Sequence, residues 1–104
     1  MKRPDLDQAI KAIWDRNRGI TEDRLRTLVE LSERLSSGPV DAELRSRAQH
    51  EAHKIAGSAG SFGFQEISEL ARELELMLSA ETGDLPAGDV ASKVSRLREL
   101  IAGS

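Results

Sequence analysis

Two residues one helical turn apart, His53 and Gly57, point most directly to chemistry in this chain. The apolar residues around them recur three or four positions apart, as in an amphipathic helix: Leu44, Ala48, Ala52, Ile55, Ala59 and Phe62. At about 100° per residue, His53 points roughly 145° away from the centre of this apolar stripe, and Gly57 lies on the same exposed side. An exposed imidazole can act as a nucleophile. A glycine beside it lets another protein approach closely, because glycine has no side chain.

The stretch from His53 to Gly63 reads HKIAGSAGSFG and resembles the phosphoacceptor helix of histidine-containing phosphotransfer (HPt) domains. The family pattern is roughly His-x-x-Lys-Gly-x-x-x-x-x-Gly, on the second helix of a four-helix bundle. The resemblance implies that His53 carries a phosphoryl group, with Gly57 and Lys54 in supporting positions. The lysine of the pattern is replaced by Ala56, and Lys54, the nearest cation in sequence, lies about 100° around the helix from His53.

The resemblance also implies partners. They are response-regulator receiver domains and a hybrid sensor histidine kinase, contacted by residues around the histidine: Gln49, His50, Ala56 and Gly60. The chain has no Walker loop, kinase loop or carboxylate cluster that would hold magnesium, so we expect no cofactor of its own and Mg²⁺ on the receiver. A neutral imidazole can take a phosphoryl group from a phosphoaspartate and pass it on. We therefore expect a phosphoryl carrier in a two-component phosphorelay and not an enzyme.

His50 is a second exposed histidine and a rival acceptor. Lys54, and not a small residue, follows it after one turn, which favours His53 as the acceptor. The pair His50 and His53 has a spacing that can bind a metal, but no Cys and no convincing third ligand accompany it, apart from Gln49 or Glu51. We therefore expect no metal site.

Other functions remain open at this stage. Gly57, Gly60 and Gly63 could form a phosphate-binding loop, but such a loop follows a strand, and the residues before it have a helical pattern. The chain could instead be the phosphoacceptor domain of a chemotaxis-type histidine kinase. It could also be an interaction bundle that docks on a kinase or receiver without accepting phosphate, and the absent lysine at Ala56 favours this alternative.

Charge is unevenly spread over the helix of His53 and the one after it. The first is basic, at Arg45, Arg47 and Lys54. Together these residues could meet an acidic pocket on a receiver or steady a phosphoryl group, although each alone is typical of a solvated helix. The next helix is acidic, with Arg72 among its glutamates, and we expect these glutamates to face solvent: Glu66, Glu69, Glu73 and Glu75.

The periodicity predicts five helices, of which two precede the histidine helix. The first runs from Pro4 or Asp5 to about Asn17, and Gly19 suits its C-terminal end. Its apolar edge consists of Leu6, Ile10, Ile13 and Trp14. The second begins with Thr21 as N-cap and ends before the turn formed by residues 36–39.

The histidine helix itself is expected from the cap Asp41 to about Ser61, with Gly63 as its breaker. The fourth helix starts near Gln65 and ends at the turn formed by residues 82–88. The fifth runs from the cap Asp89 to about Ile101. Because the connections are short, sequential helices should be antiparallel neighbours.

The fold class expected is therefore all-α. Segments two to five form an up-down four-helix bundle, and the additional N-terminal helix covers one end or side through Trp14. The chain has 104 residues, enough for a single domain over residues 1–104. It has no Cys, and its net charge of −3 argues against nucleic acid as a partner. It shows no membrane-spanning run or signal peptide, so we expect a cytoplasmic monomer that does not bind membranes. Frequent Arg and Ala point to a bacterial source.

Overall fold

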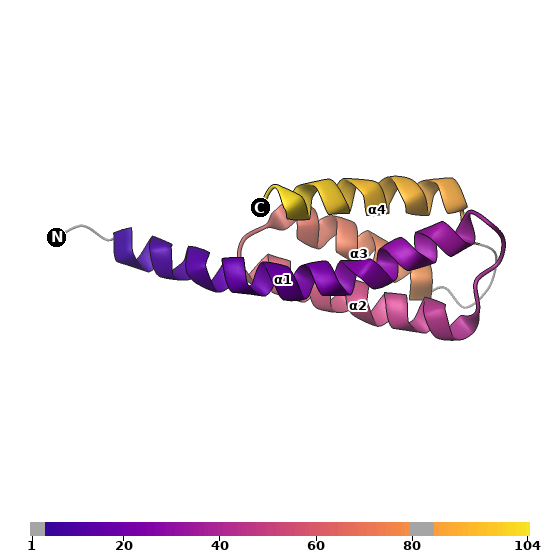
Figure 1. Cartoon of the computed structure of the whole chain (residues 1–104), viewed down its shortest axis with the longest axis horizontal. Coiled ribbons are helices and arrows are strands. Elements are labelled where there is room, and N and C mark those ends of the chain that lie inside the picture. The colour runs from indigo at the N-terminus through magenta and orange to yellow at the C-terminus, as the bar shows by residue number, and fades with distance from the viewer. Residues whose placement is uncertain (1–3, 80–84) are drawn as a thin grey trace.

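A computed structural model of the chain describes residues 4–79 and 85–104. This part contains four α-helices and no strand: α1 Pro4–Leu35, α2 Ala42–Ser61, α3 Gln65–Ser79 and α4 Ala87–Ala102. Successive helices run in opposite directions (Figure 1), α2 packs between α1 and α3, and α4 packs on α1 and α3. The all-helical class is confirmed. The molecule measures 57 × 20 × 20 Å because the N-terminal part of α1 extends beyond the other helices.

The predicted break between the first two helices is wrong, and both belong to α1. Thr21, expected as an N-cap, is buried, and its hydroxyl donates to the carbonyl of Asn17 at 3.0 Å, one turn back in the same helix. Nothing lies within 4 Å of the position that a Cβ would take on Gly19, so this glycine is an ordinary interior residue of α1. Trp14, Thr21 and Leu25 form one continuous buried face across the expected break. The additional helix is therefore an extension of the first bundle helix.

Trp14 anchors the N-terminal half of α1 to one end of the bundle, as its sequence position predicted. Its ring centroid lies 5.2 Å from that of Phe62, the C-cap of α2, and 4.5 Å from that of Phe64, in the connection to α3. Its Nε1–H donates to the hydroxyl of Ser104 at 3.1 Å. Aromatic contacts of this kind add to the free energy gained by burial alone.

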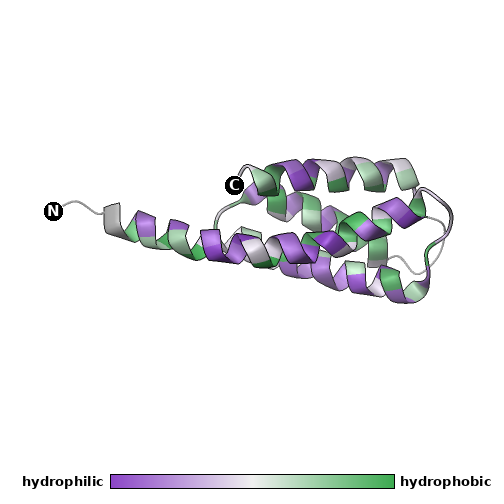
Figure 2. Ribbon diagram, viewed as in Figure 1, coloured by the Kyte–Doolittle hydropathy of each residue, from purple (hydrophilic) through white to green (hydrophobic). Residues whose placement is uncertain are grey.

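The remaining residues of the predicted apolar edge are not buried. Leu6, Ile10 and Ile13 are exposed, together with Ile20 further along α1. At the N-terminal end the reason is the extension of α1 beyond the ends of α2, α3 and α4, which leaves no helix to cover this edge (Figures 1 and 2). Ile13 and Ile20 lie beside the end of α2, where they border an open hollow with Ser58.

The helix α2 begins and ends as predicted. The side chain of Asp41 accepts a hydrogen bond from the Leu44 N–H at 2.7 Å, which caps the first turn. Phe62 is the C-cap, and Gly63 follows with φ of 82°, a left-handed conformation that favours glycine. The buried face of α2 is formed by Leu44, Ala48, Ala52, Ile55, Ala56 and Ala59. Its many alanines let α3 approach closely.

The start of α3 at Gln65 is also confirmed. The last helix begins earlier than expected, since Pro86 and not Asp89 is its N-cap. Asp89 lies within the first turn of α4 and forms an ion pair with Lys93 at 3.5 Å. Part of the turn predicted for residues 82–88 lies outside the described residues. No helix of the described part is long and apolar enough to cross a membrane.

Candidate functional site

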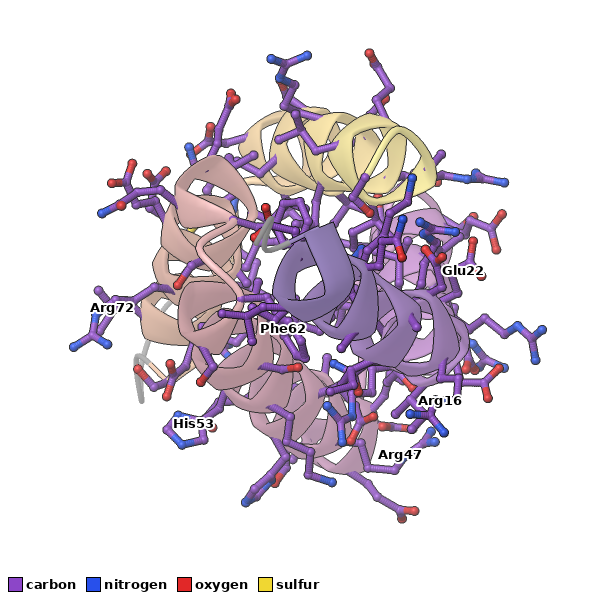
Figure 3. All side chains as sticks on the ribbon, turned by 90° about the vertical axis from the view of Figure 1, so that its left-hand side faces the viewer. Arg16, Glu22, Arg47, His53, Phe62 and Arg72 are labelled. Carbon is purple, nitrogen blue, oxygen red and sulfur yellow. The ribbon has the colours of Figure 1, made fainter. Side chains whose placement is uncertain are left out.

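His53 lies on the exposed surface of α2, as predicted, with 71% of its side chain accessible (Figure 3). It faces the side of α2 on which α3 packs, and its Nδ1 is 2.8 Å from Oε2 of Glu75. An ionised carboxylate can only accept a hydrogen bond, so Nδ1 is the donor in this contact. In the neutral ring, Nε2 then carries the free lone pair and faces outward (Figure 3). The arrangement can present an imidazole nucleophile in one fixed tautomer.

Glu75 was expected to face solvent with the other glutamates of its helix, and this prediction is wrong. Only 21% of its side chain is accessible, and its carboxylate is directed at α2. The connection between α2 and α3 is short, so residues equally far from Phe64 on the two helices lie at the same level. Gly60 meets Ser68 in this way, and His53 meets Glu75. This register of the α2–α3 hairpin is the signal that could have identified Glu75.

Gly57 follows His53 after one turn and borders open space. Nothing lies within 4 Å of the position that its Cβ would take, and the residue is exposed. The helix continues through it to Ser61, whose hydroxyl donates to the Gly57 carbonyl at 3.0 Å. No strand precedes this stretch in the described chain, so the alternative of a phosphate-binding loop is wrong. The packing of the chain itself does not explain the glycine, whereas the close approach of a partner would.

Lys54 is held away from His53. Its Nζ is 3.2 Å from Oε1 of Glu51, a residue that leaves α2 roughly 160° around the helix from His53. The lysine side chain itself leaves α2 about 100° from His53. The geometry therefore gives Lys54 no direct contact with the imidazole.

The residues expected to contact a partner do not all lie at the surface. His50 is exposed, with Nδ1 2.9 Å from the carbonyl oxygen of Ser46, and Gln49 is half-buried beside it. Ala56 was expected to contact a partner, and this is wrong because its side chain is buried between the helices with only 8% accessible. Gly60 is exposed, but a Cβ there would lie 3.2 Å from the hydroxyl of Ser68. Close packing of α3 therefore accounts for that glycine.

Of the basic residues on α2, Arg45 has a structural role. Its Nε donates to the carbonyl of Leu78 at 2.9 Å and its Nη2 to that of Met77 at 3.4 Å. These carbonyls belong to the last turn of α3, where a cation complements the negative end of the helix dipole. Arg45 thus stabilises the end of α3.

Comparison with known proteins places this geometry in a family. Residues 5–103 match the Hpt domain family. Over 65 residues the chain is 32% identical to Protein RcaC from Microchaete diplosiphon, which covers 62% of this chain and 10% of that protein. The chain thus aligns with only about a tenth of the length of this relative. No solved structure gives a significant match. The match over nearly the whole chain shows that it belongs to the Hpt domain family, the phosphotransfer domains of two-component systems.

Proposed function

We propose that this chain carries a phosphoryl group on His53 in a two-component phosphorelay. It would take the group from one receiver domain, or from a hybrid sensor histidine kinase, and deliver it to a response regulator. The observation that carries this proposal is the exposed imidazole of His53, whose Nδ1 is held 2.8 Å from Glu75 while its Nε2 faces outward. Gly57, open to its surroundings one turn later, supports the close approach of the donor and acceptor.

The proposed transfer needs no additional base, because every bond and electron pair is accounted for by the imidazole and the phosphoaspartate. The lone pair on Nε2 of His53 attacks the phosphorus of a phosphoaspartate on the receiver. The Nε2–P bond forms, the bond from phosphorus to the carboxylate oxygen breaks, and the aspartate leaves with the electron pair. The ring becomes a phosphorylated imidazolium, and Glu75 accepts the hydrogen bond from its Nδ1–H and stabilises its charge. The reverse step passes the group to the next aspartate.

The receiver provides the remaining groups in this proposal. Phosphoryl transfer needs a divalent cation and charged groups around the transferred oxygens, and we assign Mg²⁺ to the acidic site of the partner. The contribution of this chain is to hold a nucleophile rigid, exposed and in one tautomer. It therefore acts as a carrier and not as an enzyme.

The test is phosphorylation of the purified chain, followed by intact mass. A small phosphoramidate and a phosphorylated receiver serve as separate donors for the native protein and for the variants His53→Gln and His50→Gln. His50 is a matched control, because it is also exposed and its Nδ1 is also held by an acceptor. We expect one acid-labile phosphoryl group that is lost only in His53→Gln. A folded native protein that takes phosphate from neither donor would instead favour an interaction bundle that only docks.

A further inference from the structure

Phosphorylation of His53 would create a charge conflict on the surface of α2. A phosphoryl group carries close to two negative charges at neutral pH, and the carboxylate of Glu75 already lies 2.8 Å from the other nitrogen of the same ring. The carboxylate and the phosphoryl group would flank the ring from opposite sides, and they repel each other across it, although the imidazolium charge between them offsets part of that repulsion. A cation near the outward nitrogen would offset that repulsion and stabilise the phosphorylated form.

Three of the basic residues near this surface are placed elsewhere. Arg45 donates to the last carbonyls of α3, and Lys54 forms an ion pair with Glu51 at 3.2 Å. Arg47 leaves α2 about 120° around the helix from His53 and nearly two turns earlier. None of these three side chains is positioned to meet a phosphoryl group on the outward nitrogen of His53.

Arg72, on α3, remains. It is exposed, and it makes no ion pair or hydrogen bond with the part of the chain that the structure describes. Figure 3 shows Arg72 and His53 projecting on the same side of the molecule, where α2 and α3 pack together. Its guanidinium is directed outward into solvent and so is available to a new anion.

The register of the two helices places Arg72 at the level of Ala56, about one turn of α2 from His53. Glu75 contacts His53, and Ser68 donates to the carbonyl of Ala56 at 2.8 Å. Arg72 lies between Ser68 and Glu75 along α3, on the same face of that helix, about 60° closer to solvent than Glu75. It therefore projects outward from α3 about one turn from the histidine, on the side of the molecule to which His53 also projects (Figure 3). Ala56, at the same level of α2, is buried and brings no cation to this side of the molecule.

We propose that Arg72 binds the phosphoryl group carried by His53, and that α3 thereby provides the cation that α2 lacks at Ala56. The proposal rests on the function proposed above for His53. A guanidinium suits this role because its planar donors can meet two phosphoryl oxygens at once. Arg72 stabilises the product of the transfer, while Glu75 sets the tautomer of the nucleophile.

The experiment uses the full chain and a small phosphoramidate donor, so that no partner protein is involved. The variants are Arg72→Gln, Arg72→Lys and Arg98→Gln. Arg98 is the matched control because it is exposed on α4, a helix that does not pack on α2. The readouts are the rate of phosphorylation, the rate of phosphohistidine hydrolysis and the ³¹P chemical shift of the phosphorylated protein.

We expect Arg72→Gln to slow phosphorylation about fivefold, as expected for the loss of one solvated charge contact, and to move the ³¹P resonance. Arg72→Lys should recover part of the rate, and Arg98→Gln should match the native protein. High salt should reduce the difference between the native protein and Arg72→Gln. The thermal stability of all three variants should stay close to native, because both arginines are exposed.

Two results would overturn the role of Arg72 while leaving that of His53 intact. One is a rate and a ³¹P shift in Arg72→Gln equal to those of Arg98→Gln. The other comes from repeating the assay of the same variants with a phosphorylated receiver as donor: a defect seen only with that donor would assign Arg72 to the partner interface. Phosphate that persists in His53→Gln, or that is absent from the native protein, would instead refute the proposed function itself.

Discussion

The contact between His53 and Glu75 decides which nitrogen of the ring can react. A free imidazole exchanges its proton between Nδ1 and Nε2, so only part of the population presents a lone pair at the outward position. The 2.8 Å contact with Glu75 holds the proton on Nδ1. Because the histidine itself is largely exposed, this one contact restricts its ring more than any packing does.

Glu75→Ala should therefore slow phosphorylation of His53. We expect a loss of about three- to tenfold, since a hydrogen bond of this kind contributes about 0.5–1.5 kcal/mol. Glu75→Gln should lose less, because its amide oxygen can still accept from Nδ1. The measurement is the rate with a phosphoramidate donor, together with the ¹⁵N shifts of the ring, which report the tautomer. Equal shifts in the native protein and in Glu75→Ala would contradict this role.

Gly57 allows helix stability and phosphotransfer to be separated. Gly57→Ala should stabilise the protein by about 0.5–1 kcal/mol, because a helix interior favours alanine and the added methyl group meets nothing within 4 Å. Gly57→Leu should fold equally well but slow transfer from a phosphorylated receiver more than tenfold, since its side chain occupies the space of the partner. Denaturant unfolding and stopped-flow transfer measure the two effects. Normal receiver transfer in Gly57→Leu would show that no partner approaches here.

At the scale of single helices, sequence patterns succeeded where the signals were local. The cap Asp41 and the left-handed Gly63 bracket α2, and each acts within a few residues of its own position. The break predicted in α1 failed because Thr21 has the residue type of an N-cap, whereas burial places it inside the helix. The partner of His53 was missed for a related reason. Glu75 meets it only through the register of two packed helices, which no local pattern contains.

Two glycines that look alike in sequence should respond in opposite ways to alanine. Gly19→Ala should stabilise α1 by about 0.5–1 kcal/mol, because it lies inside the helix with open space around it. Gly63→Ala should destabilise the protein by about 1 kcal/mol or more, since φ at this position is 82°. Chemical denaturation of both variants gives the comparison. Stabilisation by Gly63→Ala would mean that the connection between α2 and α3 can relax.

Two neighbouring apolar residues of α1, Trp14 and Ile13, should also differ sharply in how much their substitution destabilises the protein. Trp14→Ala should cost about 3–5 kcal/mol, because Trp14 is 3% accessible and packs on Phe62 and Phe64. Ile13→Ser should change the stability by about 0.5 kcal/mol or less, because Ile13 is 46% accessible. Urea unfolding monitored by circular dichroism applies to both variants. A large loss in Ile13→Ser would show that this edge of α1 is covered in solution.

For the molecule as a whole, the position of the site depends on how α3 is held. α3 carries Glu75 and Arg72, and it is packed between α2 and α4. Ion pairs reinforce its contact with α4, at 3.1 Å between Arg96 and Glu66 and at 3.2 Å between Lys93 and Glu73. Contacts on the side of α3 away from the histidine thus help to fix the residues that face it.

The pH dependence of stability should report the ion pairs of Lys93, one of which connects α4 to Glu73 on α3. Its hydrogen bond to Glu73, together with the charge of Asp89, raises the pKa of Lys93 above 10.5. The folded state therefore holds this proton more tightly than the unfolded state. The stabilisation is complete below about pH 10 and is lost as the pH rises through the folded-state pKa. Lys93→Met removes these ion pairs. The difference in unfolding free energy between the native protein and this variant should therefore be constant up to about pH 10 and shrink at higher pH.

Urea unfolding at a series of pH values from about 8 to 11.5 measures this difference. Lys11→Met, at an exposed position of α1, is the control for removing one lysine. Its difference from the native protein should not shrink over the same range. If the native protein and Lys93→Met instead lose stability in parallel up to the highest pH, the ion pairs of Lys93 do not hold α3 against α4. The position of Glu75 and Arg72 opposite the histidine would then depend on apolar packing alone, chiefly on the buried faces of α3 and α4.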